Sequence, residues 1–207
     1  MLPWRMRSRP TARILLALGS LLTTVLAAEI VLRFVEPPEA GSSFDHRVPH
    51  PVLGWVLEPG ASSRHVMREA AVRVSYSSEG WRDVEHEPVA GEGVFRLLVL
   101  GDSFMEAYSV ELEDSFARLL EEGLRGAGGR PEVINLGVGG YGTLQKALLV
   151  EERGRAYAPD LVLLGFYVDN DVRNNSRELK TLYGQRGLKA ESRPYLEPGE
   201  SRRPTLT

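Results

Sequence analysis

The chain of 207 residues has no cysteine and only four histidines, and these two shortages exclude several kinds of chemistry. Without cysteine it has no disulfides, no thiolate nucleophile, and no zinc-finger or iron–sulfur site. The four histidines, which are His46, His50, His65 and His86, are too few and too scattered to predict a histidine-rich metal site. We therefore expect no metal and no cofactor.

The chain also has little positive charge outside its N-terminus. Residues 1–13 carry four arginines and no acid, whereas the remainder carries 21 basic and 28 acidic side chains, a balance of −7. An acidic body without a cluster of lysine and arginine argues against binding to nucleic acid. The hydrophobic content of 43% and the charged content of 26% are typical of a globular protein rather than a disordered one.

A long apolar segment follows the arginines. Ile14–Ala28 is free of charge, and the apolar character continues to residue 35. Residues 14–35 would form a helix of about 33 Å, which is enough to span a bilayer. Arginines before the segment predict a cytoplasmic N-terminus and an extracytoplasmic body, periplasmic or on the cell surface. We expect residues 1–35 to be a single-pass anchor; a signal peptide cleaved near Val25–Ala28 is the alternative.

Behind this segment, the chain divides into three parts by composition. Residues 36–43 are a linker rich in Pro, Gly and Ser. Residues 44–93 form a small extended region with short strands expected at 54–57 and 72–76. Residues 94–207 form the main domain, and they begin with a nearly continuous apolar run at 95–101.

The main domain alternates strands and helices. Strands are expected at 95–101, 132–136 and 160–165, and helices between them are expected to begin after Asp114 and Thr143. This pattern predicts an α/β fold, a doubly wound (flavodoxin-like) parallel sheet in three α/β/α layers. Such sheets usually have about five strands. Because residues 173–207 show no further convincing strand, we expect an incomplete sheet with an uncovered apolar edge, and a chain that is the N-terminal part of a longer enzyme.

Polar and glycine-rich loops follow each of the three predicted strands. They are Gly101-Asp102-Ser103-Phe104, the glycine-rich segment 137–142, and Asp169-Asn170-Asp171. Because the carboxyl ends of neighbouring parallel strands meet at one edge of a sheet, these loops should converge. A serine there can act as a nucleophile, and glycine and asparagine N–H groups can stabilise an oxyanion. Each loop alone is typical of an ordinary turn; the ordered occurrence of all three indicates acyl transfer.

These motifs resemble the first three motif blocks of the SGNH hydrolases, also called the GDSL esterase/lipase family. The resemblance covers about residues 50–198 and includes Gly54-Trp55 and Gly80-Trp81-Arg82-Asp83, which recur in membrane-anchored members. It implies a membrane-anchored serine hydrolase of carboxylic esters, with Ser103 as the nucleophile. The oxyanion hole would consist of the Ser103 N–H, Gly140 and Asn170. Gly139 is the alternative to Gly140, and Asp169 or Asp171 could line the same loop as Asn170.

The family's general base is a histidine in an Asp-x-x-His block late in the domain, and no histidine follows His86 in this chain. We expect the four earlier histidines to be solvated loop residues. Two alternatives to a hydrolase therefore stay open. One is an O-acyltransferase or deacetylase of exported polysaccharide at the same site, so that the substrate is an ester or an O-acylated carbohydrate. The other is a catalytically inactive, membrane-tethered binding protein.

Overall fold

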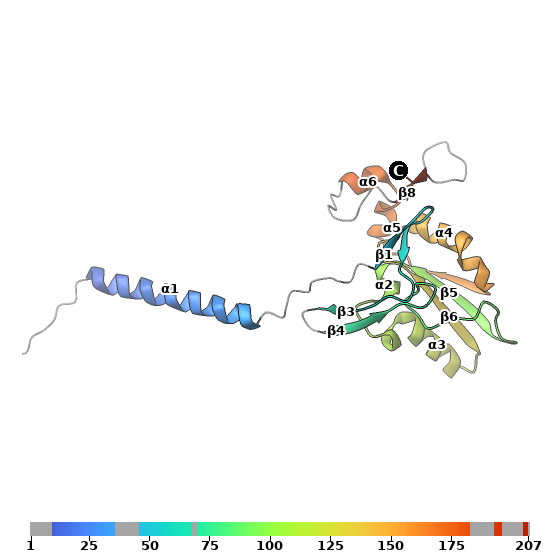
Figure 1. The fold of residues 1–207 in the computed structure, drawn as a ribbon, viewed down its shortest axis with the longest axis horizontal. Coiled ribbons are helices and arrows are strands. Elements are labelled where there is room, and N and C mark those ends of the chain that lie inside the picture. Colours follow the sequence, from blue (N-terminus) through green and yellow to red (C-terminus); the bar gives the residue numbers. More distant parts are fainter. Residues whose placement is uncertain (1–9, 36–45, 68–69, 183–192, 196–204, 207) are drawn as a thin grey trace, which may run out of the picture. The chain divides into compact units, whose positions relative to one another are not determined.

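The computed structural model describes residues 10–35, 46–67, 70–182, 193–195 and 205–206 (Figure 1). The chain divides into two compact units, Met1–Gly41 and Ser42–Thr207. The linker predicted at 36–43 lies outside the described residues.

The first unit contains one helix, α1 (Pro10–Val35), of 26 residues. Proline at the first helical position costs no hydrogen bond, because that N–H has no partner in a helix. The stretch Pro10–Leu32 is long and apolar enough to cross a membrane, and its side chains are exposed. The expected apolar helix is therefore present.

The second unit begins with two antiparallel hairpins. The first pairs β1 (Arg47–His50) with β2 (Gly54–Leu57), and the second pairs β3 (Ser62–Val66) with β4 (Ala71–Ser75). Trp55, Leu57, Val72 and Val74 from these hairpins belong to the same buried cluster as residues of the main sheet.

The main sheet has three parallel strands in the order β6-β5-β7. They are β5 (Phe95–Gly101), β6 (Pro131–Gly137) and β7 (Leu161–Leu164). All three lie within one residue of their predicted bounds. The register pairs Gly101 with Gly137 and Leu100 with Leu164, so all three strands end at the same edge.

Two helices pack on opposite faces of this sheet, α3 (Phe116–Gly126) and α4 (Thr143–Glu152) (Figure 1). Alternate residues of β5 separate into two buried clusters, because successive side chains in a strand point to opposite faces. Leu97 and Val99 lie with Ala117 of α3, whereas Leu98 and Leu100 lie with Leu149 of α4.

The predicted helix starts need correction by one residue. Ser115, rather than Asp114, caps α3, because Asp114 belongs to the short 3-10 turn η1 (Leu112–Asp114) and the Ser115 hydroxyl accepts from the Arg118 N–H. Gly142, rather than Thr143, precedes α4, and Gln145 reaches back to its N–H.

The remaining elements are short. They are α2 (Ser103–Glu106), η2 (Gly154–Tyr157), α5 (Asn170–Arg173), α6 (Arg177–Leu182), β8 (Pro194–Tyr195) and β9 (Thr205–Leu206). The last two form an antiparallel pair of two residues each, where the sequence predicts no strand. Neither pairs with the main sheet.

Candidate active site

The loops after β5, β6 and β7 are joined to one another by backbone hydrogen bonds. The N–H of Val138, after β6, donates to the carbonyl oxygen of Gly101 at 3.2 Å. The N–H of Gly165, after β7, donates to the carbonyl oxygen of Leu100 at 2.7 Å. The three loops that the sequence singles out therefore begin side by side.

Ser103 is the first residue of α2, directly after β5. Asp102 precedes it and caps the helix, and its carboxylate accepts from the N–H of Phe104 at 3.0 Å. Asp102 is buried and Ser103 is partly exposed. Among the described residues, the N–H of Ser103 has no hydrogen-bond acceptor. Ser103 thus presents both a hydroxyl and an unused backbone donor at the end of β5.

Gly139 and Gly140 after β6 differ in what their N–H groups do. The Gly139 N–H donates to the carboxylate of Glu106 at 2.5 Å. The Gly140 N–H has no acceptor within the described part of the chain, and its carbonyl oxygen accepts from the Asn174 side chain at 3.1 Å. Gly140 has φ +84°, a conformation that favours glycine. Of the two, Gly140 is therefore the residue with a donor left for a ligand.

Asn170 begins α5, after β7, and is tied to the Ser103 loop. Its side-chain N–H₂ donates to the Asp102 carboxylate at 2.6 Å. This bond uses one of the two amide hydrogens. The neighbouring acids are engaged elsewhere, since Asp169 is exposed and pairs with Arg173, and Asp171 is buried and pairs with Lys146. Asn170 is thus the residue of this loop that faces the end of β5.

Glu106 is a support of the site that sequence reasoning did not identify. Its carboxylate is 3% exposed and accepts from the Tyr76 hydroxyl at 2.7 Å as well as from Gly139. Burial raises the pKa of Glu106, and these hydrogen bonds oppose that shift. A Cβ on Gly139 would lie 2.8 Å from a carboxylate oxygen of Glu106 and 3.7 Å from the Ser103 Cβ. The absence of a side chain at Gly139 allows this close approach.

Arg82, in the Gly80-Trp81-Arg82-Asp83 stretch, binds the backbone that follows Ser103. Its buried guanidinium donates to the carbonyl oxygens of Glu106 and Ala107, at 3.1 and 2.6 Å, and to that of Val110. Burial lowers its pKa. Nothing local in the sequence links residue 82 to residues 106–110, so sequence reasoning did not identify this role.

A buried ion pair fixes the loop after β7. Lys146 of α4 lies 2.6 Å from the Asp171 carboxylate, and both side chains are at most 1% exposed. Lys146 also donates to the Gly165 carbonyl oxygen, and Asp171 accepts from the Tyr167 N–H. This pair holds the segment that carries Asn170 against α4.

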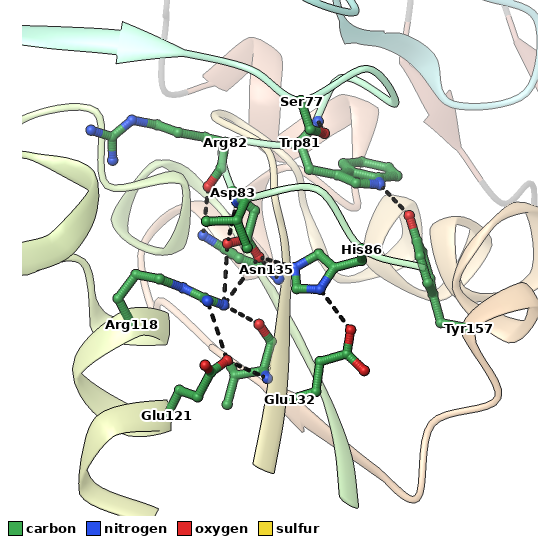
Figure 2. Close-up of polar contacts among 12 residues, drawn as sticks. Ser77, Trp81, Arg82, Asp83, His86, Arg118, Glu121, Glu132, Asn135 and Tyr157 are labelled. Carbon is green, nitrogen blue, oxygen red and sulfur yellow. Dashed lines mark hydrogen bonds and ion pairs between the residues drawn. The ribbon is translucent and has the colours of Figure 1, made fainter. Parts of the chain in front are cut away.

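The expectation that the histidines are solvated loop residues is wrong in part: His46 and His86 lie outside helices and strands, but none of the four is exposed. His50 ends β1 and His65 lies in β3. The His86 side chain is 5% exposed and lies between two carboxylates, with Asp83 at 3.0 Å and Glu132 at 2.9 Å (Figure 2). Asp83 and His86 have the Asp-x-x-His spacing, which is readable in the sequence.

His86 is nevertheless far from Ser103. Glu132 lies at the start of β6 and pairs with Arg96 at the start of β5. Ser103 follows the other end of β5, and the five residue steps from Arg96 to Gly101 span about 16 Å of strand. Within the described residues, no histidine contacts Ser103. The Asp83–His86 pair is therefore a structural contact and not a general base for Ser103.

The part of the chain that the structure describes contains no group of three or more His, Cys, Asp or Glu suited to hold a metal ion. The arrangement at the strand ends is thus a serine with neighbouring N–H donors.

No protein-family model matches this sequence, and no curated protein matches it. Among solved structures, the chain is similar to one described as a mutant of "Esterase AlinE4", with 25% sequence identity and a TM-score of 0.35. The similarity covers 44% of this chain and spans half of the length of that esterase.

Proposed function

We propose that the chain is a serine hydrolase of the SGNH type that acts on carboxylic ester bonds. Ser103 is the nucleophile, and the N–H groups of Ser103, Gly140 and Asn170 form the oxyanion hole. The proposal includes the flavodoxin-like layering of that family. The burial of Leu97 with α3 and of Leu98 with α4, on opposite faces of the sheet, supports that layering.

One observation carries the proposal: three partly exposed residues lie after the ends of three neighbouring parallel strands, and each is adjacent in sequence to a buried residue. Ser103 follows Asp102, Gly140 follows Gly139, and Asn170 precedes Asp171. Hydrogen bonds join the three loops through Asp102–Asn170 and Glu106–Gly139. Donors fixed in advance lower the cost of stabilising a developing oxyanion, typically by about 3–4 kcal/mol per donor.

The chemistry follows from these roles. The Ser103 hydroxyl attacks the carbonyl carbon of the ester, its proton passes to a base, and the carbonyl oxygen becomes an oxyanion held by the three donors. Collapse of this intermediate expels the alcohol, which takes up that proton from the base, and leaves an acyl-serine. Water then hydrolyses the acyl-serine to the carboxylic acid and free Ser103.

A second candidate, a binding protein without catalysis, is favoured by one observation. Among the described residues, the Ser103 hydroxyl has no hydrogen-bond partner and no histidine beside it. Loss of a triad histidine costs on the order of a million-fold in rate and leaves the pocket able to bind. The two candidates predict different reactivity of the same serine.

A fluorophosphonate probe, which reacts covalently with activated serines, separates the two candidates. The hydrolase proposal predicts labelling of the full chain that disappears in Ser103→Ala and persists in Ser109→Ala, a matched control because Ser109 lines the same small pocket as Ser103. Added imidazole should accelerate labelling if the base is what limits it. No labelling with or without imidazole would reject the hydrolase and leave the binding protein.

We also propose that α1 anchors the chain in a membrane with residues 44–207 outside the cytoplasm. The apolar length of α1 and the arginines before it support this orientation. Because the chain has no cysteine, Ser62→Cys introduces a single thiol at an exposed position of β3. A membrane-impermeant maleimide should label it in intact cells; labelling only after lysis would reject the orientation.

A further inference from the structure

A small hollow opens beside Ser103, with a volume of about 320 Å³. Besides Ser103, its lining consists of Phe104, Ala107, Tyr108, Ser109, Val110 and Phe116. Five of these six are apolar or aromatic and none carries a charge. The other hollows described differ in this respect, since their linings include charged side chains such as Arg153, Arg73 and Asp169. The uncharged hollow is thus the one that the candidate nucleophile shares.

Residues outside this hollow fix the side chains and backbone that line it. The ring of Phe104 packs against that of Tyr167 at 4.9 Å, and the ring of Tyr108 packs edge-on against His65 at 5.3 Å. Arg82 binds the backbone carbonyls of Ala107 and Val110 from the opposite side. Pockets that bind small ligands are typically formed before the ligand arrives, and these contacts have that effect here.

Apolar surface around the hollow is available to a ligand. Phe104 is 63% exposed, Phe116 is 43% exposed and Val110 is 37% exposed. A straight alkyl chain that starts at a carbonyl beside Ser103 would bury this surface, and burial of apolar surface is the main favourable term in such binding. A charged or sugar-bearing acyl group would find no ionic partner in the lining.

We infer that the hollow lined by Phe104, Tyr108, Val110 and Phe116 is the acyl-chain subsite, and that the substrates are esters of short, straight, uncharged carboxylic acids longer than acetate. The inference rests on the proposed function, because it places the carbonyl carbon at Ser103. Acetate has too few carbons to cover the apolar lining of the hollow, so affinity should rise with chain length until the hollow is filled.

The test measures binding rather than turnover, so that it does not depend on a base. The full chain in lipid nanodiscs, with Ser103→Ala to prevent reaction, is titrated with acetate, propionate, butyrate and hexanoate. The NMR signals of the Val110 methyl groups report the dissociation constants, and empty nanodiscs correct for partition into lipid. Each added CH₂ should tighten binding up to about fourfold while it still reaches apolar wall.

A matched pair of variants locates the effect. Val110→Phe narrows the hollow and should abolish the gain with chain length while acetate binding persists; here the methyl signals of Ala107 report binding. Val84→Phe introduces the same change at a residue that is 44% exposed outside the hollow, and it should keep the gain. If Val110→Phe fails to fold, Phe116→Ala, which removes one wall, should weaken hexanoate more than acetate, and Phe95→Ala, of similar exposure, should not.

The outcomes separate this inference from the proposed function. Affinity that does not depend on chain length, or a gain unchanged in both Val110→Phe and Phe116→Ala, overturns the subsite even if Ser103 reacts with fluorophosphonate. Affinity that rises with chain length and falls with Val110→Phe supports the subsite even if Ser103 never reacts, and the proposed hydrolase then fails alone.

Discussion

The two edges of the main sheet are built in opposite ways. On β6, outward-facing backbone groups are paired with side chains: the Val133 N–H donates to Glu121 at 2.9 Å and the Asn135 N–H to Asp83 at 2.7 Å (Figure 2). On β7, the described residues pair only with β5, and Leu161, Val162 and Leu164 are 42–48% exposed. Polar caps blunt an edge strand, whereas an exposed apolar edge favours pairing with another chain.

The two edges therefore support the candidate site through different contacts. The β6 edge is closed by an ionic cluster from residues far apart in sequence, Asp83, Arg118 and Glu121. The β7 edge is open, yet the loop that follows it is fastened by the buried Lys146–Asp171 pair. The site is thus supported by rigid contacts on both sides although only one edge is covered.

The largest effect is expected from removing the charge at the centre of the β6 cluster. Asp83 is fully buried as a side chain and binds Arg118, His86 and the Asn135 N–H. Asp83→Asn should destabilise the second unit by about 3–5 kcal/mol, because it leaves a buried cation and donor poorly paired. Thermal unfolding should show a loss of roughly 6–20 °C. Glu151→Gln, in an exposed pair with Arg155, should change stability by less than about 1 kcal/mol. Equal losses of stability in both variants would contradict this difference between a buried and an exposed carboxylate.

The next effect concerns the fastening behind β7. Lys146→Met should cost about 3 kcal/mol, since the Asp171 carboxylate is left buried without its partner. It should also slow fluorophosphonate labelling at Ser103, because Asn170 adjoins Asp171. The double variant Lys146→Met with Asp171→Asn should recover part of the stability. Arg155→Met, in an exposed pair with Glu151, is the matched control and should change little. If the double variant recovers stability but not labelling, the Lys146–Asp171 pair stabilises the fold without positioning Asn170 for the site.

Much of this fold is predictable from local sequence. The apolar runs at 95–101 and 132–136 and the glycines that follow them predict the strands and their loops, because hydrophobic pattern and turn residues are local signals. Ser103, Gly140 and Asn170 are readable for the same reason, since each lies in the loop that follows a strand.

What supports these residues is not readable in the same way. Arg82 binds carbonyl oxygens 24–28 residues away, and Asp83 binds Asn135, 52 residues away. Such contacts depend on tertiary packing, so neither spacing nor propensity predicts them. Ser115 replaces Asp114 as the cap of α3 by one residue, which is within the usual uncertainty of helix ends.

The pH dependence of stability should reflect the protonation of His86 at the β6 edge. Burial tends to lower the pKa of His86, but its hydrogen bonds to Asp83 and Glu132 outweigh this and raise the pKa above 6.5. A raised pKa means that the protonated form stabilises the folded state. This stabilisation is complete below about pH 6.5 and is lost as the pH rises through the folded pKa, with a slope of at most about 1.4 kcal/mol per pH unit.

Urea unfolding between pH 6 and 9 tests this prediction. His86→Gln should remove the slope, and His65→Gln, in the β3–β4 hairpin away from β6, should keep it. A wild-type stability that is flat or rises over this range, with no difference in His86→Gln, would show that His86 does not hold the edge by its charge.

The smallest effect on stability, and the sharpest on association, is expected at the open edge. Val162→Lys places a charge on β7 at a residue that is 42% exposed, and Val84→Lys places the same charge at a residue 44% exposed beside the capped edge. Both should change stability by no more than about 1 kcal/mol. Sedimentation in detergent should show less self-association of Val162→Lys than of the unaltered chain, and no change in Val84→Lys. A lysine on β7 would then act as Asp83 and Glu121 act on β6. In both places, a charged side chain at the edge makes pairing with another strand unfavourable. If self-association is the same in both variants, the exposed side chains of β7 are not where copies meet, and exposure alone does not make that edge different from the capped one.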